Sequence, residues 1–284
     1  MPAPPPDARS LVATCTSVTD CGADGVILAV RPPEGFSKLR AARFFMLRRL
    51  DSLSPEIPRP FSLYRQEGDE LQFLIKVMGK GTRALAATRP GEELRLIGPL
   101  GNGWPTLTPG GAHWVMLGGG IGSAPFFELI RQARAGMDGA APVPADQITF
   151  FYGGAHEGFL YDLEAFEALG VRVVACTDDG SRGFKGNVLQ ALQAEWEAGR
   201  VPHESRLLAC GPERMLEATG RLAADRGLDS WLSLESLMGC GVGICNGCPV
   251  ATRPDGPLGE WTNAKCCVEG PVFEGRAIDL EAAV

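Results

Sequence analysis

The order of apolar and polar residues divides the chain into three parts, of which the first runs to about residue 105. Short runs rich in β-branched and aromatic residues alternate there with turn residues, as in VILAV (26–30), RFFMLRR (43–49), LQFLIKVM (71–78) and ELRLIGPL (93–100). Short strands at regular spacing, without a long helical pattern, predict a small antiparallel β-barrel.

After a linker, TLTPGGA (106–112), the pattern changes to buried strands that alternate with helices. The apolar runs HWVML, ITFFYGG, VRVVACTDDG and RLLACGP are typical of buried strands. The amphipathic stretches PFFELIRQARAG, EAFEALG and NVLQALQAEWEAG, and a further one over Glu213–Arg226, are typical of helices. Strands and helices in alternation predict a doubly wound parallel α/β sheet.

The last part breaks this alternation and gathers cysteines. Five of the nine cysteines of the chain lie between Cys240 and Cys267. The whole pattern predicts an α+β multidomain protein with an N-terminal antiparallel β-barrel (8–105), a doubly wound parallel α/β domain (113–232) and a small C-terminal cysteine-rich domain (233–284).

Composition narrows the possible functions. With 284 residues, 45% hydrophobic and 21% charged, the chain lies in the range of globular proteins. A net charge of −7 argues against nucleic acid or an anionic membrane as the main partner. The start, MPAPPPDARS, lacks the apolar core of a signal peptide, and no apolar run reaches the roughly 18 residues of a membrane span. We therefore expect a short disordered leader (2–8) and a cytoplasmic protein whose cysteines serve metal or redox chemistry.

The cysteine cluster has the spacing of an iron–sulfur site. Cys240, Cys245 and Cys248 form C-x4-C-x2-C, followed later by a further cysteine, which is the plant-type [2Fe–2S] pattern. Glycines between these residues suit a loop that turns its thiolates inward. Zinc modules usually use two short cysteine pairs, so zinc is the weaker interpretation, and a disulfide framework is weaker still. Spacing alone leaves the fourth ligand open between Cys266 and Cys267.

A glycine-rich turn marks a candidate nucleotide site. LGGGIGSAPF (117–126) follows an apolar strand and opens a helix, where a pyrophosphate can meet backbone N–H groups. The turn lacks the G-x-G-x-x-G pattern, and a tight turn without a ligand is the alternative. Its candidate residues are Gly118, Gly119, Gly120 and Gly122.

A second strand is expected to end at the same edge of the sheet with ACGP (209–212). Cys210, with Gly211 and Pro212, is therefore a candidate neighbour of a nicotinamide ring, although a packed cysteine at a strand end is equally consistent with the pattern. GGAHEG (153–158) has no arginine or lysine for a 2′-phosphate, which favours NAD over NADP.

The barrel part contains two short motifs that suit phosphate groups. Arg59 in RPFSLY offers a guanidinium fork, and Ser62 a small hydroxyl. Gly81 and Thr82 in GKGT offer amides and a hydroxyl for a second phosphate. Each motif is weak alone, and an isolated Arg59 would more often be a surface charge. No Ser/His/Asp arrangement for hydrolysis is visible in the sequence.

Taken together, the motifs resemble one family. The chain resembles the electron-transfer subunit of the NAD-linked (class 1B) dihydroorotate dehydrogenase, within the ferredoxin-reductase superfamily. The motifs that carry this resemblance, in order, are RPFSLY, GKGT, GPLGNGW (98–104), LGGGIGSAP, TDDGSRGFKGNV (177–188), ACGP, ESLMGCGVGICNGC (235–248) and CVEGPVF (267–273). The stretch between Cys248 and Cys267 is long for the family, and Pro249 directly follows the third cysteine.

The resemblance implies three cofactors and their sites. NAD would lie at the GGGIG turn, and Cys267 would be the fourth [2Fe–2S] ligand because it begins the family's C-x-x-G-P-V-F motif. FAD would lie on the barrel. The residues that the resemblance assigns to FAD are Arg59, Pro60, Phe61, Ser62, Leu74, Ile75, Lys76, Gly81 and Thr82.

The resemblance also implies a function. Electrons would pass from an FMN-containing catalytic subunit through the [2Fe–2S] cluster and FAD to NAD⁺, as dihydroorotate is oxidised to orotate in pyrimidine biosynthesis. The complex would be a heterotetramer of two plus two chains, and no side chain of this chain would act as acid, base or nucleophile. The region 233–284 has seven acidic and three basic residues, which favours docking through an apolar surface.

Two alternatives remain from the sequence. The same motifs occur in NAD(P)H–ferredoxin-type reductases and in reductase subunits of hydrogenase or sulfite reductase complexes. A zinc-stabilised nucleotide-binding module without catalytic activity is the alternative from a different class.

Overall fold

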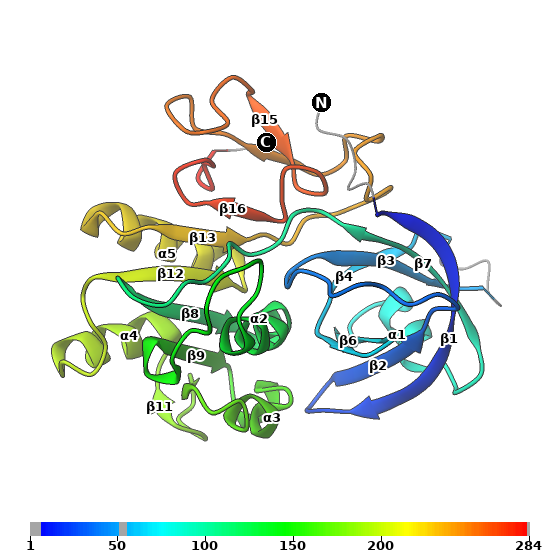
Figure 1. Cartoon of the computed structure of the whole chain (residues 1–284), viewed down its shortest axis with the longest axis horizontal. Helices are drawn as coiled ribbons and strands as arrows, with labels where there is room; N and C mark the ends of the chain where they lie inside the picture. Colours follow the sequence, from blue (N-terminus) through cyan, green and yellow to red (C-terminus); the bar gives the residue numbers. More distant parts are fainter. Residues whose placement is uncertain (1–6, 51–55, 283–284) are drawn as a thin grey trace.

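The computed structural model describes residues 7–50 and 56–282, and Figure 1 shows how its parts are arranged. Within these ranges the chain forms two seven-stranded sheets, which lie side by side, and one two-stranded sheet. The predicted leader lies outside the described residues except for Asp7 and Ala8. Asp7 forms an ion pair with Arg43, with 2.8 Å between carboxylate oxygen and guanidinium nitrogen.

The first sheet is antiparallel and curls around an apolar core. Its strands are β1 (Arg9–Asp20), β2 (Gly25–Arg31), β3 (Phe44–Arg49), β4 (Arg59–Ser62), β5 (Arg65–Glu67), β6 (Glu70–Lys76) and β7 (Glu93–Leu100). They are ordered β4-β3-β7-β1-β2-β6-β5, and no strand pairing within the described ranges joins β4 to β5. The predicted barrel is therefore an open half-barrel. A short helix, α1 (Lys80–Ala86), lies against it, which the sequence pattern did not indicate.

The second sheet has the predicted doubly wound form. Its strands are β8 (His113–Gly119), β9 (Ile148–Gly154), β10 (Arg172–Thr177), β11 (Phe184–Lys185), β12 (Ser205–Cys210), β13 (Ser230–Ser233) and β16 (Val272–Glu274). The order is β11-β10-β9-β8-β12-β13-β16, parallel from β11 to β13. Strand order reverses between β8 and β12, and ligands bind at such a switch point.

Helices cover both faces of this sheet. They are α2 (Ala124–Ala135), α3 (Leu163–Glu167), α4 (Val188–Glu197) and α5 (Glu213–Arg226), with short 3₁₀ turns η1 (Gly120–Ser123), η2 (Ala145–Gln147) and η3 (Glu157–Phe159). Because side chains alternate along a strand, Trp114 and Met116 of β8 join the core under α2 and α3. Val115 and Leu117 join the core on the opposite face, under α4 and α5.

The C-terminal part lies along the β13 edge of the second sheet (Figure 1) and also packs on the half-barrel through Gly241 and Met46. Strands β14 (Pro249–Ala251) and β15 (Asn263–Lys265) form a small antiparallel hairpin. The chain then returns to pair β16 antiparallel with β13, so the cysteine-rich part completes the second sheet.

The predicted fold class is confirmed: an antiparallel half-barrel, a doubly wound parallel sheet and a small C-terminal part. The ranges 8–105, 113–232 and 233–284 stay a prediction, since β16 from the third range belongs to the sheet of the second. Within the described residues, no helix combines the length and apolar character needed to span a membrane.

Candidate functional site

A cavity of about 250 Å³ lies where β4 and β6 of the half-barrel face η1 and α2 of the second sheet. Most of the residues that the resemblance assigns to FAD line it: Arg59, Pro60, Phe61, Ser62, Leu74, Lys76 and Thr82. Ile75 does not. The side chains of a strand point alternately to opposite faces, so Leu74 and Lys76 face the cavity while Ile75 is buried in the half-barrel core.

The GKGT motif also shapes the start of α1. The Thr82 hydroxyl accepts hydrogen bonds from the N–H groups of Met78 and Gly79, both 2.9 Å away, and so caps the start of α1. Gly81 is not a lining residue. A Cβ at this position would lie 3.1 Å from Cγ of Arg59, so Gly81 makes room for the arginine stem. Amide N–H groups in the first turn of a helix remain free for a ligand.

A second cavity, of about 310 Å³, lies across the carboxyl ends of the parallel strands at the switch point. It is lined by Lys76, Gly119, Gly120, Ile121, Gly153, Gly154, Asp178, Asn187, Val188, Gly211, Pro212, Met215 and Glu235. Gly120 has φ 55°, a left-handed conformation that favours glycine. Backbone of the predicted glycine turn thus borders the cavity.

The other two predicted glycines of this turn serve packing. A Cβ on Gly122 would lie 2.3 Å from the carbonyl oxygen of Cys210, so only glycine lets η1 approach the end of β12 this closely. A Cβ on Gly118 would lie 2.8 Å from the ring of Phe150. Of the four predicted residues, Gly119 and Gly120 line the cavity, whereas Gly118 and Gly122 allow close packing behind it.

The two cavities meet. Lys76, Ile121 and Glu235 line both of them, so ligands in the two cavities would be neighbours. Cys210 is a buried residue at a strand end and also lines the first cavity. Burial raises the pKa of its thiol, which argues against a nucleophilic thiolate.

Glu235 was not predicted as a site residue. It follows the exit of β13 and lines both cavities, on the boundary between them. Desolvation raises its pKa, although the nearby charge of Lys76 acts in the opposite direction. An acidic residue two positions after a buried strand was the available sequence signal.

The cysteines of the C-terminal part form two pairs. The sulfur atoms of Cys248 and Cys267 are 3.3 Å apart. In the other pair, the sulfur of Cys240 accepts the backbone N–H of Cys245 at 3.4 Å. The sulfur of Cys266 instead lies 3.8 Å from the carbonyl oxygen of Leu234, inside the protein. The geometry therefore favours Cys267 over Cys266 as the fourth ligand.

Thiolates are the metal-binding form of cysteine, and two of these residues are poised to ionise. Burial raises the pKa of Cys240, but the N–H groups of Cys245 and Val242 outweigh it and lower the value to about 7. The adjacent Cys267 thiol lowers the pKa of Cys248 to about 6, and the same contact raises the pKa of Cys267. Burial raises the pKa of Cys266 to about 12, as in an inert core cysteine.

These residues fit a [2Fe–2S] cluster better than a single ion. In the described part of the chain, no three His, Cys, Asp or Glu side chains gather around one metal position. A [2Fe–2S] cluster does not require this, because each iron takes two protein thiolates and shares two bridging sulfides. Gly239 and Gly247 flank Cys245, and a Cβ on either would be in van der Waals contact with its sulfur, at 3.4 Å.

The hairpin explains how the long stretch after Cys248 still brings the ligands together. β14 begins at Pro249 and β15 ends at Lys265, so the cysteines lie at the same end of the two paired strands. The N–H of Cys266 donates to the carbonyl oxygen of Cys248 at 2.8 Å. Proline at the first position of a short strand is compatible with this pairing.

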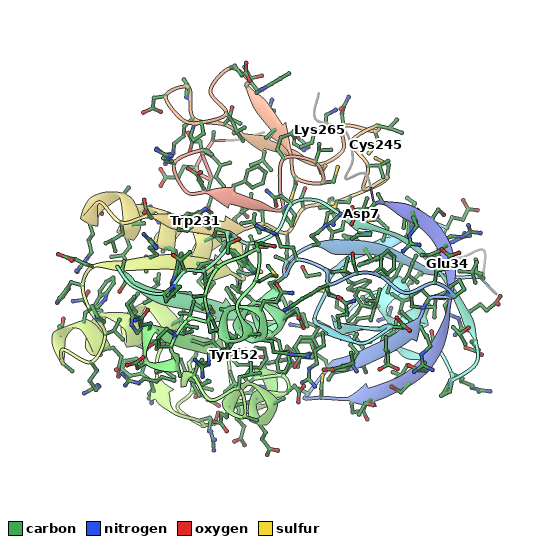
Figure 2. All side chains as sticks on the ribbon, in the orientation of Figure 1. Asp7, Glu34, Tyr152, Trp231, Cys245 and Lys265 are labelled. Atoms are coloured by element: carbon green, nitrogen blue, oxygen red, sulfur yellow. The ribbon has the colours of Figure 1, made fainter. Side chains whose placement is uncertain are left out.

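Two polar side chains order this part: Asn102 fastens it to the segment after β7, and Lys265 ties its hairpin to the cysteine loop. The Asn102 side chain donates to the carbonyl oxygens of Glu269 (2.8 Å) and Val272 (2.7 Å) and accepts the N–H of Val272 (3.0 Å). Lys265 donates from Nζ to the carbonyl oxygen of Gly243 at 2.8 Å. Figure 2 shows Lys265 and Cys245 in the part that lies over the two sheets. Neither side chain was predicted, although Asn102 stands in the GPLGNGW motif.

The half-barrel, the parallel sheet with two joined cavities and the paired cysteines define an iron–sulfur oxidoreductase of the ferredoxin-reductase type. Two family models match the chain. One is described as the iron–sulfur cluster binding domain of dihydroorotate dehydrogenase B and matches residues 235–279. The other, the oxidoreductase NAD-binding domain, matches residues 116–221.

Two curated relatives carry the same description, dihydroorotate dehydrogenase B (NAD(+)), electron transfer subunit. That of Bacillus caldolyticus is 34% identical over 242 residues, covering 84% of this chain and 86% of the relative. That of Desulforamulus reducens is 32% identical over 236 residues, covering 81% of this chain and 83% of the relative. The chain belongs to the family of dihydroorotate dehydrogenase B (NAD(+)) electron transfer subunits.

Solved structures agree on the fold. The structure of an NADH-dependent reduced ferredoxin–NADP oxidoreductase superposes with a TM-score of 0.76 at 23% identity, covering 95% of this chain and 90% of that chain. A ferredoxin NADP⁺ reductase from Neisseria gonorrhoeae, with bound FAD and NADP, gives a TM-score of 0.63 at 20% identity, covering 78% and 93%.

Proposed function

We propose that this chain is the subunit that passes electrons between a catalytic partner chain and NAD⁺ while the partner oxidises dihydroorotate to orotate. The observation that carries this proposal is the junction of the two cavities at Lys76, Ile121 and Glu235, beneath a part of the chain with paired cysteines. The family to which the chain belongs supports it.

The cofactors explain why three sites are needed: a nicotinamide exchanges two electrons as a hydride, an iron–sulfur cluster carries one, and a flavin does both. In our proposal the first cavity holds the ring system of FAD against β4 and Leu74, with Arg59 toward its phosphates. The second cavity holds NAD, with its pyrophosphate at Gly119 and Gly120. Cys240, Cys245, Cys248 and Cys267 hold the [2Fe–2S] cluster.

The protein itself binds, orients and shields in this proposal. Met238, two residues before Cys240, lines the first cavity, so the cysteine loop and the flavin position are adjacent. Gly241 packs directly on the half-barrel, since a Cβ there would lie 2.6 Å from Cγ of Met46. Cys210 supplies a protonated, buried thiol at the cavity wall.

We infer that the partner docks on an apolar surface around the cysteine loop. Leu237 is 89% exposed and Ile244 is 81% exposed. Cys245, which directly follows Ile244, is exposed as well. Large exposed apolar side chains of this kind mark interaction sites. The occupant would be an FMN-containing catalytic subunit, in a heterotetramer of two plus two chains. Free cysteines throughout fit a cytoplasmic location for this complex.

Purification of the chain with its native partner tests the proposal. We expect dihydroorotate-dependent NAD⁺ reduction by the complex and FMN on the partner. A partner that carries nickel, sirohaem or further iron–sulfur centres would overturn the assignment in favour of a hydrogenase or sulfite reductase complex. A colourless chain that contains zinc, without flavin or acid-labile sulfide, would instead support a non-catalytic module.

Charge substitutions test the docking surface separately. Ile244→Asp and Leu237→Asp should each weaken co-purification of the partner while iron content stays unchanged. Trp261→Asp is the matched control, because Trp261 is 47% exposed on the loop between β14 and β15. Equal loss of the partner in all three variants would contradict docking at the cysteine loop.

A further inference from the structure

The end of the nucleotide cavity farthest from the flavin position carries one unpaired acidic residue. Along the sheet, the cavity passes from Pro212 after β12 to Gly120 after β8, then to Gly154 at the end of β9 and Asp178 after β10. Lys76 and Glu235 mark the opposite end, because they also line the flavin cavity. A dinucleotide with its nicotinamide beside the flavin would therefore place its adenosine ribose near Asp178.

The backbone fixes Asp178 in this position. Its N–H donates to the carbonyl oxygen of Gly154 at 3.1 Å, which ties the loop after β10 to the end of β9. Among the described residues, the Asp178 carboxylate has no hydrogen-bond or ion-pair partner. This carboxylate is therefore free to accept hydrogen bonds from a ligand.

The neighbouring acid is engaged elsewhere. Asp179 accepts hydrogen bonds at one carboxylate oxygen from the N–H (2.9 Å) and the hydroxyl (2.6 Å) of Ser181, which closes its own turn. Asp179 does not line the cavity. These adjacent residues of the same charge thus differ in two respects: the Asp179 carboxylate is hydrogen-bonded to Ser181, and only Asp178 borders the cavity.

The basic residues of this loop do not offset the charge of Asp178 within the cavity. Arg182 pairs with Glu167 of α3, at 3.2 Å between guanidinium nitrogen and carboxylate oxygen. The stem of Lys185 lies over Gly180, and Lys185 does not line the cavity. The only lysine or arginine among the lining residues is Lys76, at the flavin end.

We propose that Asp178 is a specificity-determining residue, which selects NAD over NADP by binding the hydroxyls of the adenosine ribose and repelling a 2′-phosphate. A carboxylate accepts hydrogen bonds from ribose hydroxyls, whereas a phosphate monoester carries about −1.5 to −2 charges and would face it without a counter-charge. The sequence indicated a preference for NAD from GGAHEG, at the end of β9. The structure adds a second determinant of this preference, in the loop after β10. This inference rests on the proposed function, because it deepens the same nucleotide site.

Calorimetric titration of the full chain, with its cluster and flavin, tests this inference without turnover. The probes are 5′-AMP and 2′,5′-ADP, which differ only in the 2′-phosphate, together with NAD⁺. In Asp178→Asn we expect the preference for 5′-AMP over 2′,5′-ADP to fall by about tenfold, through tighter binding of 2′,5′-ADP and weaker binding of 5′-AMP. The matched control, Asp179→Asn, should change this preference less than about twofold.

The outcomes separate the two proposals. If wild-type protein binds NAD⁺ but Asp178→Asn leaves the preference unchanged, or Asp179→Asn shifts it equally, Asp178 does not select the nucleotide and the proposed function stands. If wild-type protein binds neither NAD⁺ nor 5′-AMP, the proposed function fails and this inference fails with it.

Discussion

The parallel sheet and the cysteine-rich part are held together by different interactions. Phe150 and Phe166, with ring centroids 5.0 Å apart, belong to a continuous aromatic core beneath α2 and α3. The cysteine-rich part has three strands of three residues each. It adds a few buried side chains, such as Phe273 and Ile278, to the core beneath α4 and α5, and it is further held by Asn102, Lys265 and the cysteine pairs. The sheet can thus fold by apolar burial, whereas the cysteine-rich part combines a smaller apolar contribution with metal ligands and polar contacts.

The largest expected effect concerns the fourth ligand. Cys267→Ser should abolish the cluster, because Cys248 loses the thiol beside it, whereas Cys266→Ser should retain it. Iron and acid-labile sulfide per chain, measured after anaerobic purification, check this prediction. If Cys266→Ser loses the cluster while Cys267→Ser keeps it, our assignment of the ligand is wrong.

A core substitution in the sheet should produce the opposite pattern. Phe150→Ala leaves a cavity among the rings of Phe126, Tyr152 and Phe166 and should lower the free energy of unfolding by about 3–5 kcal/mol. Urea denaturation measures the loss. The folded fraction should still contain a full cluster, and a cluster deficit in that fraction would show that the two regions are more strongly coupled than we infer.

Two asparagines allow a matched comparison of smaller size. Asn102→Ala removes three hydrogen bonds to 269–272 and should cost about 2–4 kcal/mol, together with faster loss of iron to a chelator. Asn187→Ala removes the N-cap of α4 and should cost about 1 kcal/mol without this change in iron loss. Equal rates of iron loss in both variants would contradict our inference that Asn102 holds the cysteine-rich part in place.

The smallest expected effect is a pH dependence of the free energy of unfolding, which arises from Glu195 of α4, on the parallel sheet. Hydrogen bonds from Arg200, and the charge of Arg172, lower the pKa of Glu195 below its ordinary value of 4.5. A carboxyl with a lowered pKa in the folded state stabilises above its ordinary pKa, and this contribution is lost as pH falls below about 4.5. The stability difference between wild type and Glu195→Gln, from urea midpoints, should shrink between pH 6.5 and pH 4, by less than about 1 kcal/mol. A constant difference would show that Glu195 contributes through packing alone.

Periodicity and motif spacing predicted much of this molecule, because both reflect local rules. The buried strands of the parallel sheet and the helix Glu213–Arg226 follow directly from their apolar patterns. Cysteine spacing indicated the ligand loop, and the family motif selected Cys267, which the geometry favours. The half-barrel was predictable as a class, but its open side was not, since local patterns do not show whether the edge strands β4 and β5 pair.

The rest depended on contacts between distant residues. A three-residue motif could not show that Ile75 faces inward while Leu74 and Lys76 face the cavity, because this depends on the register of β6 with β2. The capping role of Thr82 competes with phosphate binding in the same tetrapeptide, and sequence cannot decide between them. Asn102 contacts residues about 170 positions away, and Asp178 meets the nucleotide cavity only through the packing of β10 against β9.

The antiparallel pairing of β16 with β13 has a consequence for handling the protein. Without β16, the outer row of N–H and C=O groups of β13 would be exposed, next to the apolar side chains of Trp231 and Leu232. Exposed sheet margins of this kind recruit strands from other molecules and lead to aggregation. A change that detaches β16 would therefore threaten solubility as well as electron flow, because this strand seals the margin.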